Sequence, residues 1–182
     1  MSTVTAQTSP STAVTTVTTT EQLLPVESPS PTAIPNPSPS DSPEALCNTS
    51  ELSITLDNQQ GAAGSRLFDL TFTNTGSTEC ALQGFPGVSL VGFQNGTQIG
   101  APADREPTAT PVVQLQPGES TIAGLKLSRA ENYDLDFCSP ADVDGLRIYP
   151  PGETRAAFIH RADITGCTNE AVSLLSVKAV GS

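Results

Sequence analysis

The sequence is poor in the residues that most enzymes and metal sites need. It contains no Trp, one Met and a single histidine, His160. One histidine excludes a metal site with two or more His ligands within one chain. A Ser-His-Asp site at His160 is not expected either, because the chain lacks a G-x-S-x-G motif and the alternation of strands and helices that hosts one. We therefore expect no enzymatic activity and no cofactor.

Positive charge is also scarce. The 182 residues include 8 Lys and Arg against 19 Asp and Glu, and residues 1–45 contain no Lys or Arg at all. The remainder of the chain therefore carries 8 − 15 = −7. This balance argues against nucleic acid or an anionic membrane surface as a partner.

Long hydrophobic runs are missing as well. No stretch of 18 apolar residues occurs, so no membrane-spanning helix is predicted. Met1 is followed by polar residues instead of the basic segment and apolar core of a signal peptide. We expect that an export signal has been removed, with an N-terminal lipid anchor, if there was one, as the only link to a membrane.

Residues 1–45 are predicted to form a disordered, extended stalk. They contain 8 Ser, 10 Thr and 8 Pro, and such a composition cannot bury enough apolar surface to offset its ordering entropy. The run from Pro35 to Pro39 favours polyproline II. We place the folded domain at residues 46–180.

Four cysteines lie in this domain and are far apart in the sequence: Cys47, Cys80, Cys138 and Cys167. Their spacing excludes a C-x-x-C redox or zinc motif. An even number of dispersed cysteines indicates two disulfides and an oxidising compartment. We therefore expect a secreted or cell-envelope-anchored protein.

Hydrophobic alternation predicts a series of short strands. Leu52, Ile54 and Leu56 alternate with polar residues, the pattern of a half-buried strand. Similar patterns predict strands near 66–74, 82–90, 112–115, 123–127, 146–148, 155–159 and 171–179. Eight or nine short strands without helical periodicity predict an antiparallel, immunoglobulin-like β-sandwich of about eight strands.

Turn residues separate these strands. Residues 58–61 are predicted to reverse the chain after the first strand, and Asn95-Gly96 to form a type I′ hairpin. Pro117-Gly118 favours a type II turn. Gly84 and Pro86-Gly87 are predicted to bend the chain between Leu82 and Val88, since proline cannot donate to a ladder.

The predicted sandwich suggests how the cysteines pair. The first and last strands of an immunoglobulin-like sandwich run parallel, and Cys47 and Cys167 precede those two strands. We therefore expect a Cys47–Cys167 disulfide, which leaves Cys80 with Cys138. The second bridge requires the 128–145 connection to cross the sandwich.

Two loops are the predicted binding regions, because loops at one end of a sandwich commonly carry recognition. One is 92–111, around Asn95 and Gly96. The other is 129–142, with Asp134 and Asp136.

The second loop belongs to an acidic stretch, residues 131–144, whose carboxylates could hold calcium. However, Leu146 stands where the next oxygen ligand of a calcium loop would be, so a solvated loop is preferred. A single helical turn is expected there, with Ser139 as N-cap and Pro140 at the first helical position.

Several segments together resemble a known family. They are Cys47 to Leu56, 61–65, 72–77, the run from Cys80 to Val88 (Cys-Ala-Leu-Gln-Gly-Phe-Pro-Gly-Val), 115–119, Cys138-Ser139-Pro140 with 146–152, and the final cysteine. The chain resembles a secreted domain-of-unknown-function family common in actinobacteria, often found on lipoproteins behind a low-complexity stalk. The resemblance covers about 47–180. It implies an envelope location and supplies no activity or catalytic residues.

These observations favour a monomeric, non-enzymatic extracytoplasmic domain that binds a protein, a glycan or another envelope component. A metal-dependent module or enzyme that uses residues 131–144 is the first alternative. A structural spacer without a ligand is the second.

Overall fold

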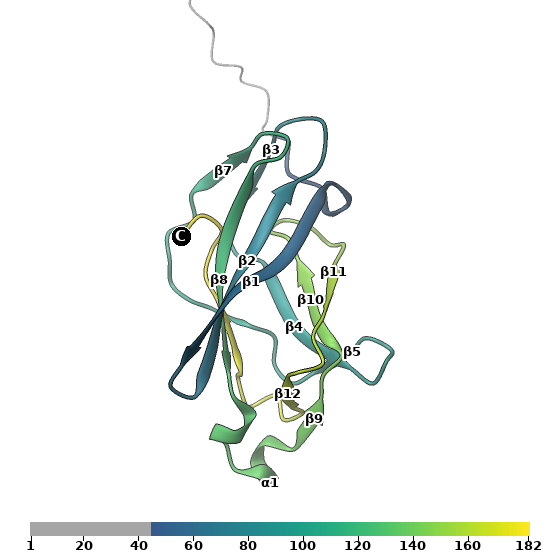
Figure 1. The fold of residues 1–182 in the computed structure, drawn as a ribbon, viewed down its shortest axis with the longest axis vertical. Coiled ribbons are helices and arrows are strands. Elements are labelled where there is room, and N and C mark those ends of the chain that lie inside the picture. Colours follow the sequence, from purple (N-terminus) through teal and green to yellow (C-terminus); the bar gives the residue numbers. More distant parts are fainter. Residues whose placement is uncertain (1–44) are drawn as a thin grey trace, which may run out of the picture. The chain divides into compact units, whose positions relative to one another are not determined.

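The computed structural model describes residues 45–182 (Figure 1). The predicted stalk lies outside the described residues, apart from Ala45. The strands are β1 (Leu52–Ala62), β2 (Ser65–Asn74), β3 (Cys80–Gln83), β4 (Gly87–Gly92), β5 (Thr97–Ile99), β6 (Asp104–Arg105), β7 (Val112–Leu115), β8 (Ser120–Ser128), β9 (Pro140–Asp142), β10 (Gly145–Tyr149), β11 (Ala157–His160), β12 (Thr165–Cys167) and β13 (Leu175–Val177). The helical segments are the one-turn helix α1 (Leu135–Cys138) and two 3₁₀ turns, Thr49–Glu51 and Ala130–Asn132. Within this range no helix has the length and apolar character that a membrane crossing requires.

Most strands belong to two sheets. One has the order β1-β2-β8-β13-β6 and the other the order β11-β10-β4-β5. The neighbours β1-β2-β8 correspond to strands A-B-E of the immunoglobulin fold, and β5-β4-β10-β11 to C′-C-F-G. Strand β13 occupies the place beside β8 that strand D has in that fold. The predicted antiparallel, immunoglobulin-like sandwich is therefore confirmed, with nine strands in the two main sheets and two further two-stranded pairs, β3-β7 and β9-β12.

The two sheets share one hydrophobic core. Phe68, Leu70 and Phe72 of β2 and Leu146 and Ile148 of β10 belong to the same buried cluster. From Phe68 in β2 and from Leu146 in β10, buried residues alternate with residues that are only partly buried. The burial of Leu146 and Ile148 therefore fixes which residues of β10 lie on the outer surface.

The first strand is longer than predicted. Instead of turning at 58–61, β1 continues to Ala62 and pairs with β2 up to Ser65. Asn58 has a φ of 49°, and the register shifts between Asp57 and Gln60. Asparagine tolerates this left-handed conformation, so it produces a β-bulge here and not a chain reversal.

The Asn95-Gly96 pair does not form the predicted two-residue turn. Strands β4 and β5 pair as far as Gly92 with Thr97, which leaves a four-residue turn, 93–96. Positive φ angles occur at Phe93, Gln94 and Gly96, and not at Asn95. The hairpin forms at the expected place, but its register requires a longer turn.

The predicted turns with proline and glycine occur at both expected places. The Gly118 φ of 86° and the bond from the Glu119 N–H to the Gln116 carbonyl, 2.9 Å, are those of a type II turn. Gly84 has a φ of 99° and, with Phe85 and the buried Pro86, joins β3 to β4, which begins at Gly87.

The helical turn begins earlier than predicted. The Asp134 side chain caps α1 by accepting the N–H of Asp136 at 3.0 Å and that of Phe137 at 3.3 Å. Ser139 stands at the other end, as a C-cap with a φ of 49°, and Pro140 begins β9. The last strand is also shorter than the predicted 171–179, because residues before Leu175 form a loop.

The predicted disulfide pairing is wrong. Cys47 is bonded to Cys80 and Cys138 to Cys167. The Cys47 N–H donates to the carbonyl of Ala81 at 3.0 Å, so this segment runs beside β3. Strand β12, which contains Cys167, pairs with β9 close to α1, at the opposite end of the sandwich from β3 (Figure 1).

The error has a topological cause. The prediction assumed that the first and last strands run parallel, whereas the pairs β1–β2, β2–β8 and β8–β13 are each antiparallel, so β1 and β13 run in opposite directions. Each disulfide instead closes a short loop at its own end of the domain, over 33 and 29 residues.

We expect non-reducing peptide mapping to recover the Cys47–Cys80 and Cys138–Cys167 linkages. Replacing either pair with Ala should lower the free energy of unfolding by about 3–4 kcal/mol, since both close loops of similar length. Denaturant titration of the two double variants measures this. Recovery of a Cys47–Cys167 peptide would contradict the assignment.

Candidate functional site

The 93–96 turn of the predicted 92–111 loop and the predicted 129–142 loop lie toward the end of the domain that is opposite β3 (Figure 1), whereas the rest of 92–111 runs back to β7, which pairs with β3. The 93–96 turn projects beyond β5, and α1 lies near β9 and β12. A hollow lined by Phe93, Gln94 and residues 140–142 separates the turn from β9. The hollow thus contains residues of both predicted loops, but Asp134 and Asp136 line neither it nor the groove described below, so they do not share a site with Asn95 and Gly96.

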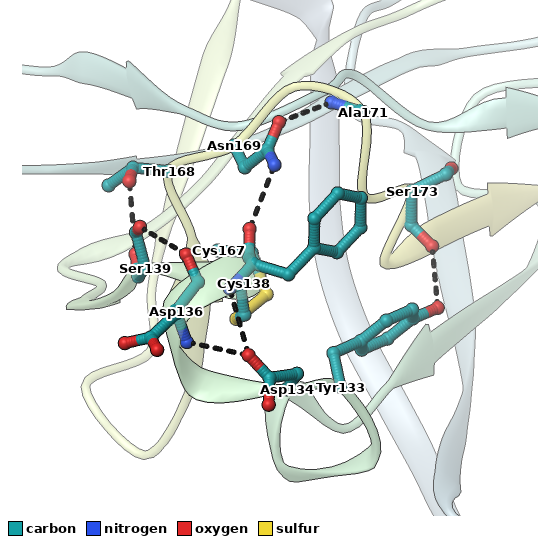
Figure 2. The surroundings of a disulfide bond; sticks show 11 residues. Tyr133, Asp134, Asp136, Cys138, Ser139, Cys167, Thr168, Asn169, Ala171 and Ser173 are labelled. Carbon is teal, nitrogen blue, oxygen red and sulfur yellow. Dashed lines mark hydrogen bonds between the residues drawn. A yellow bond between two sulfur atoms is a disulfide. The ribbon is translucent and has the colours of Figure 1, made fainter.

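Polar groups of the acidic loop form hydrogen bonds within the loop and to residues 168–169 (Figure 2). Asp134 caps α1, and Asn169 donates to the Phe137 carbonyl at 2.8 Å. The Thr168 hydroxyl donates to the Ser139 carbonyl at 3.0 Å, beside the Cys138–Cys167 disulfide. Within residues 45–182 no three Asp, Glu, His or Cys side chains are placed to share a metal ion.

A groove on the outer face of the four-stranded sheet is the strongest candidate site. Its volume is about 790 Å³, within the range of small-ligand sites. Strands β4, β10 and β11 form it, and the 93–96 turn is one wall. The lining residues are Val91, Gln94, Asn95, Gly96, Asp144, Arg147, Ala156, Ala157, Phe158 and His160.

Arg147 lines the groove from β10, the strand between β4 and β11. Its two terminal nitrogens donate to the Gly96 carbonyl at 3.2 Å and to Oε1 of Gln98 at 2.9 Å. Its Nε is buried without a hydrogen-bond partner, and the ion pairs found in residues 45–182 do not include this arginine. Two neutral acceptors therefore bind the guanidinium, and its positive charge is not neutralised by a carboxylate.

Asp144 holds the other side of the same turn. Its carboxylate accepts the N–H of Gln94 at 2.6 Å. Asp144 and Arg147, both in or next to β10, therefore attach the 93–96 turn at two points. This fixes one groove wall relative to its floor.

Phe158 forms the opposite wall. It stands directly across from Arg147 in the β10–β11 register, and 55% of its surface is exposed. Its ring lies over Gly145, where an added Cβ would come within 2.7 Å of two ring carbons and 2.2 Å of the Ile159 carbonyl oxygen. The His160 ring stands edge-on to the Phe158 ring, 6.5 Å between centroids.

An ion cluster anchors the chain that follows β11. Asp163 accepts from Arg161 at 2.8 Å and from Arg66 of β2 at 2.7 Å. The hydrogen bond from Arg161 is the main cause that lowers the pKa of Asp163 to about 2. The cluster joins the end of β11 to the other sheet and so supports the groove wall.

The groove combines predicted and unpredicted residues. Asn95 and Gly96 line it, and Asp144, weighed only as a calcium ligand, helps to build it. Arg147 and Phe158 were not singled out from the sequence. The available signal was the alternation of β10, since apolar Leu146 and Ile148 flank a single arginine.

We expect Gly145→Ala to displace Phe158 and to lower the free energy of unfolding by about 1–3 kcal/mol, because the new methyl group meets backbone and ring. The matched control is Gly61→Ala in β1, where no heavy atom lies within 4 Å of an added Cβ. That variant should be neutral or stabilising by up to about 1 kcal/mol. Denaturant titration compares the two, and equal stabilities would contradict the packing.

The Asp163 cluster predicts a pH dependence. The pKa of Asp163 in the folded protein, about 2, lies below its ordinary value. The ionised carboxylate therefore stabilises the folded state above about pH 4, and this contribution is lost as the pH falls toward 2. Because 54% of the Asp163 side chain is exposed, we expect less than about 1 kcal/mol. Asp163→Asn should be less stable than the parent at pH 6 and equal to it near pH 2. Asp142→Asn controls for net charge and should not show this convergence.

The family comparison covers the whole of this architecture. The family model described as a domain of unknown function, DUF4232, matches residues 47–181, which include all four cysteines, both sheets and the groove. No curated protein matches the chain significantly. Because the match extends over well more than half of its length, the chain belongs to the DUF4232 family of domains of unknown function.

Proposed function

We propose that this chain is a non-enzymatic, extracytoplasmic domain of the cell envelope that binds a partner in the groove of its four-stranded sheet. Two disulfides suggest an oxidising compartment. The first described residues, 45–47, lie beside β3. This is the end of the domain away from the 93–96 turn (Figure 1).

The observation that carries the proposal is the guanidinium of Arg147 beside the exposed ring of Phe158. The groove offers an apolar surface and an unneutralised positive charge across one strand pair. This combination suits a ligand that presents an apolar group next to a carboxylate, since guanidinium groups bind carboxylates through charge-assisted hydrogen bonds. A segment of an envelope protein with an acidic residue or a free C-terminus has this chemistry.

The test compares two probes that differ only in charge. N-acetylphenylalanine has a ring and a carboxylate, and N-acetylphenylalaninamide has the same ring without the charge. We expect both to shift the amide resonances of Val91, Gly96 and Phe158 in the full ¹⁵N-labelled chain. The acid should bind about two- to fivefold more tightly, as expected for a partly exposed ion pair.

Variants separate the two contributions. Arg147→Gln should abolish the tighter binding of the acid, and Phe158→Ala should lower the affinity for both probes. Ile122→Ala removes a comparably exposed apolar side chain (43%) from β8 of the other sheet. This control should leave the affinities for both probes unchanged. Thermal melting of each variant checks that the fold persists.

The outcomes are distinct. Groove shifts with equal affinities for acid and amide would support ligand binding and contradict the role of Arg147. Absence of groove shifts with either probe would contradict the groove as a binding site and favour the ligand-free spacer. Equally tight binding of a neutral N-acetylglucosamine oligomer, unaffected by Arg147→Gln, would assign the groove to a glycan.

A further inference from the structure

The 93–96 turn contains the one Asn-Gly sequence in the chain, Asn95-Gly96. Both residues are exposed, and the space around Gly96 is open: no heavy atom lies within 4 Å of the position that a Cβ would take. The backbone nitrogen of Gly96 is therefore not shielded by a side chain of its own or by a packed neighbour.

One hydrogen bond bears directly on the reactivity of the Asn95 side chain. The N–H of Thr97 donates to Oδ1 of Asn95 at 3.0 Å. If a nucleophile adds to Cγ of Asn95, negative charge develops on this oxygen. A backbone N–H already directed at such an oxygen stabilises the charge, as in an oxyanion hole.

We propose that Asn95 is a site of spontaneous deamidation in the folded protein. A base from solvent removes the proton of the Gly96 backbone N–H, and this nitrogen attacks Cγ of Asn95. The new C–N bond closes a five-membered succinimide ring, while the bond from Cγ to Nδ2 breaks and ammonia leaves with a proton. Water then opens the ring at either carbonyl, and the product is aspartate or isoaspartate at position 95.

The modification changes the groove. Either product places a new carboxylate on the wall whose Gly96 carbonyl accepts from Arg147 at 3.2 Å, so the added charge lies close to an unneutralised guanidinium. Isoaspartate also adds one carbon to the backbone of a four-residue turn that β10 holds at two points. The fraction of molecules with an altered charge and backbone at the groove therefore increases with time after synthesis.

The chain offers an internal comparison in Asp144-Gly145, which can form the same succinimide by loss of water. This pair is constrained: the Asp144 N–H donates to the Val91 carbonyl and its carbonyl accepts the Arg161 N–H, both at 2.9 Å. Gly145 belongs to β10 and pairs on both sides. Ring closure there requires breaking the sheet, so the folded protein should protect it.

The experiment incubates the full chain at pH 7 and pH 9, folded and in urea, and follows both positions by peptide mapping. In the folded protein we expect the peptide with Asn95 to gain the mass of an amide-to-acid exchange, faster at pH 9 and within a fewfold of the rate in urea. Its product should contain isoaspartate, which direct hydrolysis does not give. Asp144 should isomerise in urea and stay unchanged in the folded chain.

Controls identify the residue. Asn95→Gln lengthens the side chain by one carbon, disfavours the five-membered ring and should remove the mass gain. Asn132 is an exposed asparagine followed by tyrosine and should stay intact. An Asn95 that stays intact in the folded chain while it converts in urea would overturn the proposal, as would conversion to aspartate without isoaspartate.

Discussion

The inward burial of Leu146 and Ile148 is the constraint on which the rest of the structure depends. These two residues of β10, 1% and 0% exposed, join the core shared by both sheets. Because side chains alternate along a strand, their burial turns Arg147 and Tyr149 to the outer face of the sheet, the same face on which the Phe158 ring covers Gly145. The core therefore determines where the charge, the ring platform and the floor of the groove lie.

Strand patterning was accessible from the sequence, since burial is a local, period-two signal. Residues 112–115 form a strand at the predicted bounds, and the pattern at 52–56 lies within β1. The disulfides were not accessible, because their pairing depends on which end of the sandwich each cysteine reaches. The four-residue turn at 93–96 depends on cross-strand register, which the preference of Asn-Gly for tight turns does not reveal.

The groove was harder still to predict. It requires Arg147 and Phe158, which are 11 positions apart and meet only because β10 and β11 pair in one register. A strand of alternating pattern shows that Arg147 faces outward, but not that its partners are a carbonyl and an amide in place of a carboxylate.

The bulge in β1 has a consequence for how molecules behave when crowded together. Strand β1 lies at the edge of its sheet, where unpaired backbone groups can recruit a strand from another molecule. The left-handed Asn58, held by a 2.8 Å bond to Asp69 of β2, interrupts the regular ladder after Asp57. A strand from a neighbouring chain could pair in register with only about half of β1. The β-bulge at Asn58 therefore disfavours edge-to-edge aggregation.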